Sequence, residues 1–351
     1  MRKIFKIISI NSIIFFFIII CVDLIFGYWL DDLNFGPNMR GKRIQKIVFE
    51  KKNEKIFYYR DFYGFRENKN IYEKYDTSKI KVVFNGGSTG DEMFLNYDDT
   101  IVGVLNANMK NENIKLKIYN ASLSGKSLTG NLNEFSDWFE NIPNFKPEIM
   151  IYYLGINDRI LLKNRWHDNE KKNNFIDFIV NNISQKSFFW EKVKKIKDKY
   201  FYSNRNIDRY FTSDKKLSLK LKKNNFISYD VAKKTYMNLN DKEYFIIETY
   251  KKKLIRLKKI LNTNKIKPIF ITQITHDING QKILFYLNDE LKKFALRNNY
   301  EIIKLDELVM EPMPDSFIDE IHTNKSGSLK IANIIYPLLK NKLLSHFDLP
   351  H

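Results

Sequence analysis

The segment Lys81 to Glu92, KVVFNGGSTGDE, ends an apolar run in a glycine-rich turn with a single serine, Ser88, at its centre. A serine hydroxyl becomes a nucleophile when a positioned base removes its proton. Serines in such turns also occur in phosphate-binding loops and as ordinary turn residues. The turn is catalytic only if the rest of the chain supplies a base, an orienting carboxylate and donors for a developing negative charge.

A base and a carboxylate occur together near the C-terminus, in DSFIDEIHTNKSG. Asp319 lies three residues before His322, within the reach of one turn. An imidazole can remove a serine proton at neutral pH because histidine titrates near neutrality. A carboxylate on the other ring nitrogen holds the imidazole in the required tautomer. A surface turn or a metal pair are the alternatives, but no further His/Cys cluster supports a metal.

Two other loops offer hydrogen-bond donors. NASLSGKS contains Gly125, and LGINDR contains Asn157 and Asp158. The backbone N–H groups of Ser88 and Gly125 and the side-chain amide of Asn157 are suitable donors to an oxyanion, and losing one such donor typically costs about 2.7–4 kcal/mol of barrier. An amide donates without adding negative charge beside the oxyanion. Helix capping is the alternative for Asn157 and is our expectation for Asp158.

The elements that must position these residues are five short β-rich segments, which alternate with amphipathic helical patterns. The predicted strands are residues 79–85, 114–122, 147–155, 266–273 and 300–307. Such alternation predicts a parallel sheet with helices on both faces. In such sheets, sites form at the carboxyl ends of the strands. The turn of Ser88 and the two donor loops follow the first three strands, and Asp319 and His322 precede the last helix, so all should meet at one edge.

Taken in order, these blocks resemble the SGNH hydrolases, also called the GDSL family. GGST resembles the serine block, NASLSG the glycine block, GIND the G-x-N-D block and DEIH the D-x-x-H block, over residues 76–345. The resemblance implies a three-layer α/β/α flavodoxin-like fold with about five parallel strands. It also implies serine-dependent ester chemistry without a cofactor or metal.

By the same resemblance Ser88 is the nucleophile, His322 the base and Asp319 its partner. Ser88, Gly125 and Asn157 would form the oxyanion hole.

The serine block departs from the family in one place and also fits two other patterns. Many members have Asp just before the serine, where this chain has Gly87. The sequence also fits G-x-S-x-G, the elbow of α/β-hydrolases. That elbow normally follows several strands, whereas Ser88 follows the first. A Walker-type phosphate loop is excluded because no Lys follows Gly90 at the required place.

The N-terminus predicts membrane attachment. Residues 7–30 are largely apolar and, at about 1.5 Å per residue, long enough for the roughly 30 Å hydrocarbon core. Basic residues precede this stretch and acidic ones follow, which orients the N-terminus towards the cytoplasm. A cleaved signal peptide is the rival, but no A-x-A site follows. We therefore expect residues 1–30 to be an uncleaved anchor, with Asp23 either at the outer interface or paired inside the membrane.

Two further segments complete the predicted organisation. Residues 31–75 are polar and irregular, which predicts an extended linker before the domain at 76–345. Residues 162–240 interrupt the alternation of strands and helices and predict a helical insertion. The insertion either packs on the core or forms a basic, aromatic lid or membrane-surface helix.

Composition argues against a nucleic-acid partner. The formal net charge is +18, yet the lysines are spread along the chain and no nucleic-acid-binding signature occurs. The single cysteine, Cys21, excludes an intrachain disulfide. Arg60 and Arg66 are expected to be solvated or structural, although an anionic sugar is an alternative partner. His276 is expected to be an ordinary loop histidine rather than a substrate contact.

The GGST form, the anchor and the upstream GFR at residues 64–66 resemble a membrane-anchored bacterial branch of the family. That resemblance implies an esterase outside the cytoplasm that removes acyl groups, often acetyl, from cell-envelope carbohydrate. Two alternatives remain open: an O-acetyltransferase with the same triad, and a non-catalytic envelope-assembly or carbohydrate-binding protein.

Overall fold

The computed structural model describes every residue of the chain except 1, 32, 34, 37–38, 40–41, 52–53, 68–69, 160–174, 203–226, 237, 312 and 349–351.

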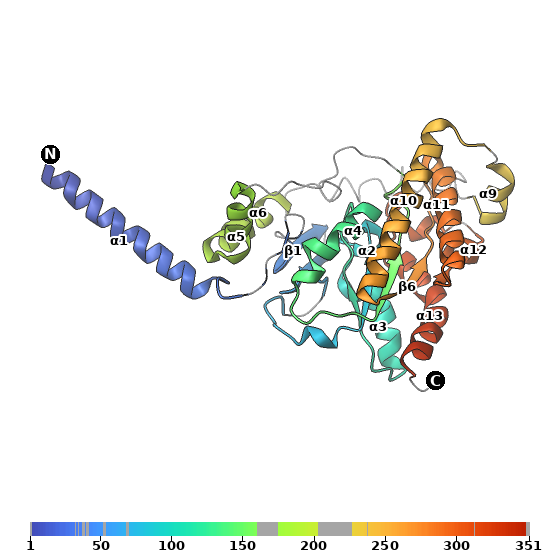
Figure 1. Cartoon of the computed structure of the whole chain (residues 1–351), viewed down its shortest axis with the longest axis horizontal. Helices are drawn as coiled ribbons and strands as arrows, with labels where there is room; N and C mark the ends of the chain where they lie inside the picture. The colour runs from blue at the N-terminus through green and yellow to red at the C-terminus, as the bar shows by residue number, and fades with distance from the viewer. Residues whose placement is uncertain are drawn as a thin grey trace.

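A five-stranded parallel sheet forms the centre of the molecule (Figure 1). Its strands are β3 (Val82–Gly86), β4 (Ile118–Asn120), β5 (Ile149–Tyr153), β6 (Lys267–Ile271) and β7 (Glu301–Ile303). The order is β4-β3-β5-β6-β7, and every neighbouring pair is parallel. This is the flavodoxin-like order. The predicted fold class is therefore confirmed.

Helices cover both faces of this sheet. On one face lie α4 (Leu128–Asp137), α10 (Asp241–Asn264) and α11 (Ile278–Arg297). On the other lie α3 (Ile101–Asn111) and α13 (Lys325–Phe347). Strand β5 supplies Met150 and Tyr152 to the first core and Ile149, Ile151 and Tyr153 to the second. Side chains that alternate between two buried faces explain why this strand is apolar throughout.

Short helices occupy the loops and ends between these elements. They are α2 (Ser88–Asp91), α9 (Tyr229–Thr235), α12 (Leu305–Leu308) and the 3-10 turns Thr77–Lys79, Tyr97–Asp99, Phe139–Asn141 and Pro314–Ser316.

The edge strands are shorter than the sequence predicts. The segment predicted at 114–122 pairs only at Ile118–Asn120, and the one predicted at 300–307 pairs only at Glu301–Ile303. On β4, the side chain of Asn106 accepts a hydrogen bond from Ile118 N at 2.8 Å and donates one to Ile118 O at 2.9 Å. β7 stops because helix α12 begins at Leu305. Apolar patterning predicted the strands, but local helix and side-chain contacts set where pairing ends.

The segment 31–75 differs from the predicted linker. Its strands β1 (Gln45–Lys51) and β2 (Glu54–Arg60) form an antiparallel hairpin. Phe35, Met39 and Phe65 are fully buried in the same core as the first face of the sheet. Tyr58 and Arg60 alternate inwards along β2. The polar composition concealed this alternation, and the segment is part of the folded body.

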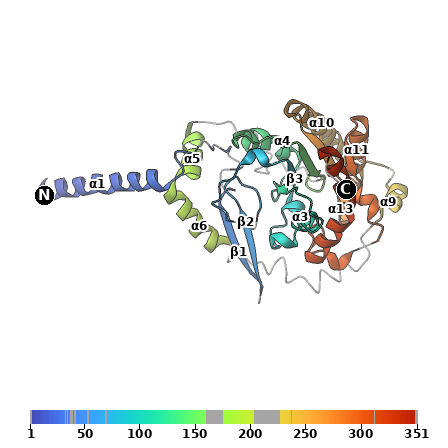
Figure 2. The same cartoon turned by 90° about the horizontal axis from the view of Figure 1, so that it is seen from below.

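Helix α1 (Arg2–Phe26) projects away from the rest of the molecule (Figure 1). Within the described part of the chain, Lys3–Phe26 is the one helix long and apolar enough to cross a membrane. From the region predicted as a helical insertion, α5 (Phe175–Lys186) and α6 (Phe188–Tyr202) lie between α1 and the β1–β2 hairpin (Figure 2). The rest of that prediction lies largely outside the described residues.

Candidate active site

Three residues from two distant parts of the chain form one hydrogen-bonded line. The Nε2 atom of His322 lies 2.8 Å from Oγ of Ser88, and its Nδ1 lies 2.7 Å from Oδ2 of Asp319. The other oxygen, Asp319 Oδ1, accepts from the backbone N–H groups of Ile321 at 2.8 Å and His322 at 2.7 Å. The structure thus brings together the serine, histidine and aspartate that the sequence singled out.

These contacts keep Asp319 ionised. Burial opposes its charge, but the hydrogen bond and charge of His322 and the two backbone N–H donors outweigh burial and lower the pKa of Asp319. An ionised Asp319 fixes a proton on Nδ1 and leaves Nε2 to accept one from Ser88, which is the arrangement that general base catalysis requires.

Ser88 is the first residue of α2, directly after the carboxyl end of β3. Its backbone N–H therefore has no acceptor in the preceding helical turn. Gly87 lies against Asn157: a Cβ atom at this glycine would come 2.2 Å from Nδ2 of Asn157. Gly87 therefore cannot carry a side chain while Asn157 keeps its position.

The loop that contains Gly125 is a tight turn. Lys126 N donates to Leu123 O at 3.2 Å, and Gly125 between them has a φ of 81°. Positive φ at this third turn position is the type II geometry that favours glycine. Nδ2 of Asn157 donates to the carbonyl of Lys126 at 2.8 Å. The loops of Gly125 and Asn157 are thus joined beside Ser88.

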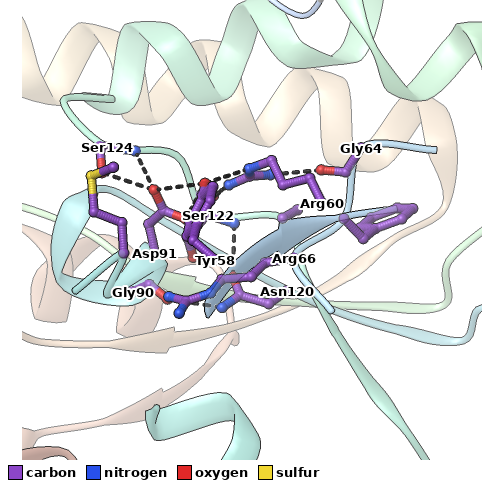
Figure 3. Close-up of polar contacts among 12 residues, drawn as sticks. Tyr58, Arg60, Gly64, Arg66, Gly90, Asp91, Asn120, Ser122 and Ser124 are labelled. Carbon is purple, nitrogen blue, oxygen red and sulfur yellow. Dashed lines mark hydrogen bonds and ion pairs between the residues drawn. The ribbon is translucent and has the colours of Figure 1, made fainter. Parts of the chain in front are cut away.

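A buried carboxylate, Asp91, ties the serine turn to the glycine turn (Figure 3). Its Oδ2 accepts from Ser124 N at 3.0 Å and from Ser124 Oγ at 2.8 Å. Its Oδ1 accepts from Arg60 Nη2 at 2.9 Å and from Tyr58 OH at 3.1 Å. Burial opposes the charge of Asp91, but Arg60, Arg66 and Ser124 outweigh it and lower its pKa. Asp91 therefore remains a charged anchor.

Arg60 and Arg66 are structural, as one of the two sequence interpretations held. Arg60 Nε donates to Tyr58 OH at 2.6 Å and Nη1 to Gly64 O at 2.6 Å (Figure 3). Arg66 Nη2 donates to Leu95 O at 2.5 Å. Both side chains are almost completely buried. They connect the β1–β2 hairpin and the residues after it to the loops around Ser88.

A second buried group lies beneath the glycine turn. The ammonium of Lys126 contacts Glu134 and Asn85, and it donates to Ala121 O at 3.1 Å. Asn85 Nδ2 donates in turn to Glu134 Oε2 at 2.9 Å. Burial lowers the pKa of Lys126 to about 8. These contacts fix the residue whose carbonyl holds Asn157.

A cavity of about 170 Å³ opens beside Ser88 and His322. Its apolar wall comes from Met93, Phe94, Leu95 and Ile318. Glu92 lines it as well, and its Oε2 accepts from Ile101 N at 2.6 Å. Its Oε1 accepts from Thr323 Oγ1 at 2.9 Å and from Ser328 Oγ. Glu92 thus holds the loop of His322 in place through Thr323 and Ser328.

Two other polar residues singled out in the sequence have different surroundings. Oδ2 of Asp158 accepts from Leu128 N at 2.9 Å, at the start of α4, so this side chain does cap a helix. His276 is 1% exposed, and its ring packs edge-on against Phe317 at 4.5 Å. Burial lowers the pKa of His276 to about 4.

Reasoning from the sequence missed Asp91, Glu92 and Lys126. Asp91 and Glu92 directly follow the serine turn, and Lys126 directly follows Gly125. Acidic and basic residues beside a glycine-rich turn were the available signal, but they are equally common on solvent-exposed loops.

No protein-family model matches the sequence, and no curated protein matches it. Solved structures similar to it include a lipase/acylhydrolase from Enterococcus faecalis, with 13% identity, a TM-score of 0.44 and coverage of 75% of this chain and 96% of that chain. A member of the lipolytic protein G-D-S-L family from Veillonella parvula has 12% identity, a TM-score of 0.41 and coverage of 74% and 98%. An acetyl xylan esterase has 13% identity, a TM-score of 0.41 and coverage of 74% and 100%. Likenesses this distant carry no argument about the reaction.

We expect Asp91→Asn to lower the free energy of unfolding by about 3–5 kcal/mol, because it leaves the buried charge of Arg60 unpaired. The loss should appear as a lower urea midpoint. Lys81→Gln is the matched control, since Lys81 pairs with Glu148 at 2.7 Å on the surface; it should cost less than about 1 kcal/mol. Equal losses in the two variants would contradict the anchoring role of Asp91.

We expect Glu92 to make stability depend on pH. Burial outweighs its hydrogen bonds and raises the pKa of Glu92 from 4.5 to about 7. The folded state therefore binds the carboxyl proton of Glu92 more tightly than the unfolded state does. The contribution of this proton to the free energy of unfolding is complete below about pH 4.5 and is lost as the pH rises through 7.

Glu92→Gln removes this titration. Its amide oxygen can accept from Ile101 N, and its NH2 group can donate to the hydroxyl oxygens of Thr323 and Ser328, which can accept as well as donate. Between pH 4.5 and 8, urea unfolding should show the wild type losing up to about 3 kcal/mol relative to this variant, at about 1.4 kcal/mol per pKa unit. The exposed Glu140→Gln should follow the wild type. Parallel pH profiles for wild type and Glu92→Gln would refute the assignment.

Proposed function

We propose that this chain is a serine-dependent carboxylic ester hydrolase that works through an acyl-enzyme. The observation that carries the proposal is the line from Ser88 Oγ to His322 Nε2 at 2.8 Å and from His322 Nδ1 to Asp319 Oδ2 at 2.7 Å. Nucleophile, base and orienting carboxylate lie at the spacing that acyl transfer requires.

In the acylation half, Ser88 Oγ attacks the ester carbonyl carbon while His322 Nε2 takes the hydroxyl proton. The carbonyl oxygen becomes negatively charged in the tetrahedral intermediate. The N–H groups of Ser88 and Gly125 and the amide of Asn157 would donate to it. The intermediate collapses by breaking the bond to the alcohol, and His322 returns its proton to the departing oxygen.

In the deacylation half, water takes the place of the alcohol. His322 removes a proton from water, the oxygen attacks the acyl carbon, and Ser88 Oγ leaves with the proton that His322 returns. The products are a carboxylic acid and the free enzyme. Asp319 stabilises the imidazolium in both halves without becoming protonated itself.

The proposed acyl group is short. The cavity beside Ser88 measures about 170 Å³. An apolar cavity of about 150 Å³ holds one benzene molecule. Acetyl and other acyl groups of a few carbons therefore fit against Met93 and Ile318.

We further propose that α1 anchors the enzyme in a membrane with its folded body outside the cytoplasm. The supporting features are the length and apolar character of Lys3–Phe26 and the basic residues that precede it. Cell-envelope carbohydrate carrying O-acetyl groups is the proposed natural substrate, and it rests on the sequence resemblance together with the small cavity.

The full-length protein should release 4-nitrophenol and acetate from 4-nitrophenyl acetate. Ser88→Ala should lower kcat/KM at least about 10³-fold, because the nucleophile is lost. Ser136→Ala, at an exposed serine on α4, should leave the rate unchanged. If Ser88→Ala and Ser136→Ala hydrolyse the ester equally fast, the proposed reaction is wrong.

A further inference from the structure

Helix α6 turns its apolar side away from the folded body. Val193, Ile196 and Tyr200 expose 55%, 58% and 62% of their surface, and Phe189 lies on the same helical stripe. A helix on a globular protein normally buries such a stripe. Here the stripe is open, and on the neighbouring α5 the apolar side chains of Ile179, Val180 and Ile183 are exposed as well.

The charged side of α6 contacts the body instead. Glu191 Oε1 accepts from Tyr72 OH at 3.4 Å, and Lys195 contacts both Glu191 and Tyr72. Lys194 Nζ donates to Arg43 O at 3.3 Å. Because the polar side of α6 holds it to the protein, its apolar side needs a different partner.

The start of α6 is fixed to the end of α1 through Asp23. Oδ1 of Asp23 accepts from Ser187 Oγ at 2.9 Å and from Phe189 N at 3.1 Å, and Oδ2 accepts from Trp29 Nε1 at 3.0 Å. A carboxylate bound to a backbone N–H of the first turn helps to cap a helix and complements its dipole. The acidic residue that is awkward in a membrane-spanning segment thus binds the first turn of α6, where Ser187 Oγ also accepts from Trp190 N at 3.2 Å.

Further contacts hold the two sides of this junction together. Tyr28 N donates to Lys186 O at 2.7 Å, and the rings of Phe26 and Phe188 lie 5.7 Å apart. Gln185 exchanges two hydrogen bonds with the backbone of Phe35, at 2.8 and 2.6 Å. The turn between α5 and α6 is therefore connected to both α1 and the folded body.

The position of the helices agrees with a membrane partner. In Figure 2, α1 runs horizontally, α5 lies at its end, and α6 runs obliquely away from that end. If α1 crosses a bilayer, both helices are therefore at the level of the bilayer surface. The exposed Lys192 and Lys197 flank the apolar stripe on its two sides. Lysines so placed reach the headgroup layer, where anionic lipids attract them.

We propose that the apolar faces of α5 and α6 lie in the interface of an anionic phospholipid bilayer, beside the membrane-spanning α1. This inference rests on the proposed anchoring by α1 and is independent of the proposed esterase reaction. Interfacial helices bury their apolar side about 5–10 Å into the headgroup and acyl boundary. Three contacts, at α1, α5 and α6, would hold the folded body at one height and orientation above the membrane.

The test uses full-length protein in nanodiscs of phosphatidylethanolamine and phosphatidylglycerol. In a Cys21→Ser background, an environment-sensitive fluorophore is attached at Ile196→Cys on α6, at Ile14→Cys in α1, or at the exposed Lys259→Cys on α10. Lipids that carry a nitroxide near the top of the acyl chain quench fluorophores at the interface. Circular dichroism melting checks that each variant is folded. The readout is fluorescence and does not depend on esterase activity.

We expect the nitroxide lipid to lower the emission of the Ile196→Cys label at least about twofold, because the stripe sits at the nitroxide's depth. The Lys259→Cys label should keep its emission. A second lipid, whose nitroxide is near the end of the acyl chain, should quench the Ile14→Cys label at the bilayer centre and reports separately that α1 is in the bilayer. An unquenched Ile196→Cys label beside a quenched Ile14→Cys label would overturn the proposal and leave the anchor standing; contact with a second protein copy would give this result. If neither is quenched, both fail.

Discussion

The buried ion pair between Asp91 and Arg60 holds together the parts from which the site is made. Asp91 ends the short helix that starts at Ser88, and Arg60 comes from the hairpin that precedes the sheet. The same carboxylate binds Ser124, the neighbour of Gly125. Removing two charges from water is costly, and such a pair is stable only with good geometry and further hydrogen bonds. Tyr58, Ser122 and Gly64 provide those bonds.

The other loops of the site are positioned relative to this ion pair by further polar contacts. The parallel sheet brings the ends of β3, β4 and β5 to one edge, but this alone does not fix the distances between the side chains of the site. Asp91 sets the serine turn against the glycine turn, and the carbonyl of Lys126 sets the glycine turn against Asn157. Glu92 fixes the last loop through Thr323, the neighbour of His322. The turns of Ser88 and Gly125, the side chain of Asn157 and the loop of His322 are thus each held by a polar contact.

Much of this architecture could be predicted from the sequence, because it depends on periodicity and on motif order. The apolar runs of the inner strands and the helical patterns around them fixed the fold class, and four short motifs in order indicated Ser88, Asp319 and His322. The supporting shell could not be predicted in the same way. Whether Asp91 meets solvent or Arg60 depends on how the hairpin packs, and its only trace is the inward alternation of β2. Asp23 likewise finds its partner Ser187 164 positions away, which no local pattern encodes.

The central claim is that Oγ of Ser88, activated by His322, is the nucleophile that becomes acylated. The most direct measurement treats the full-length protein with a fluorophosphonate, whose phosphorus loses fluoride as it bonds to an activated serine oxygen. Peptide mass spectrometry then locates the adduct. The account predicts one adduct, on Ser88, and its disappearance in His322→Gln. An adduct on another serine, or equal labelling of Ser88 without His322, would contradict it.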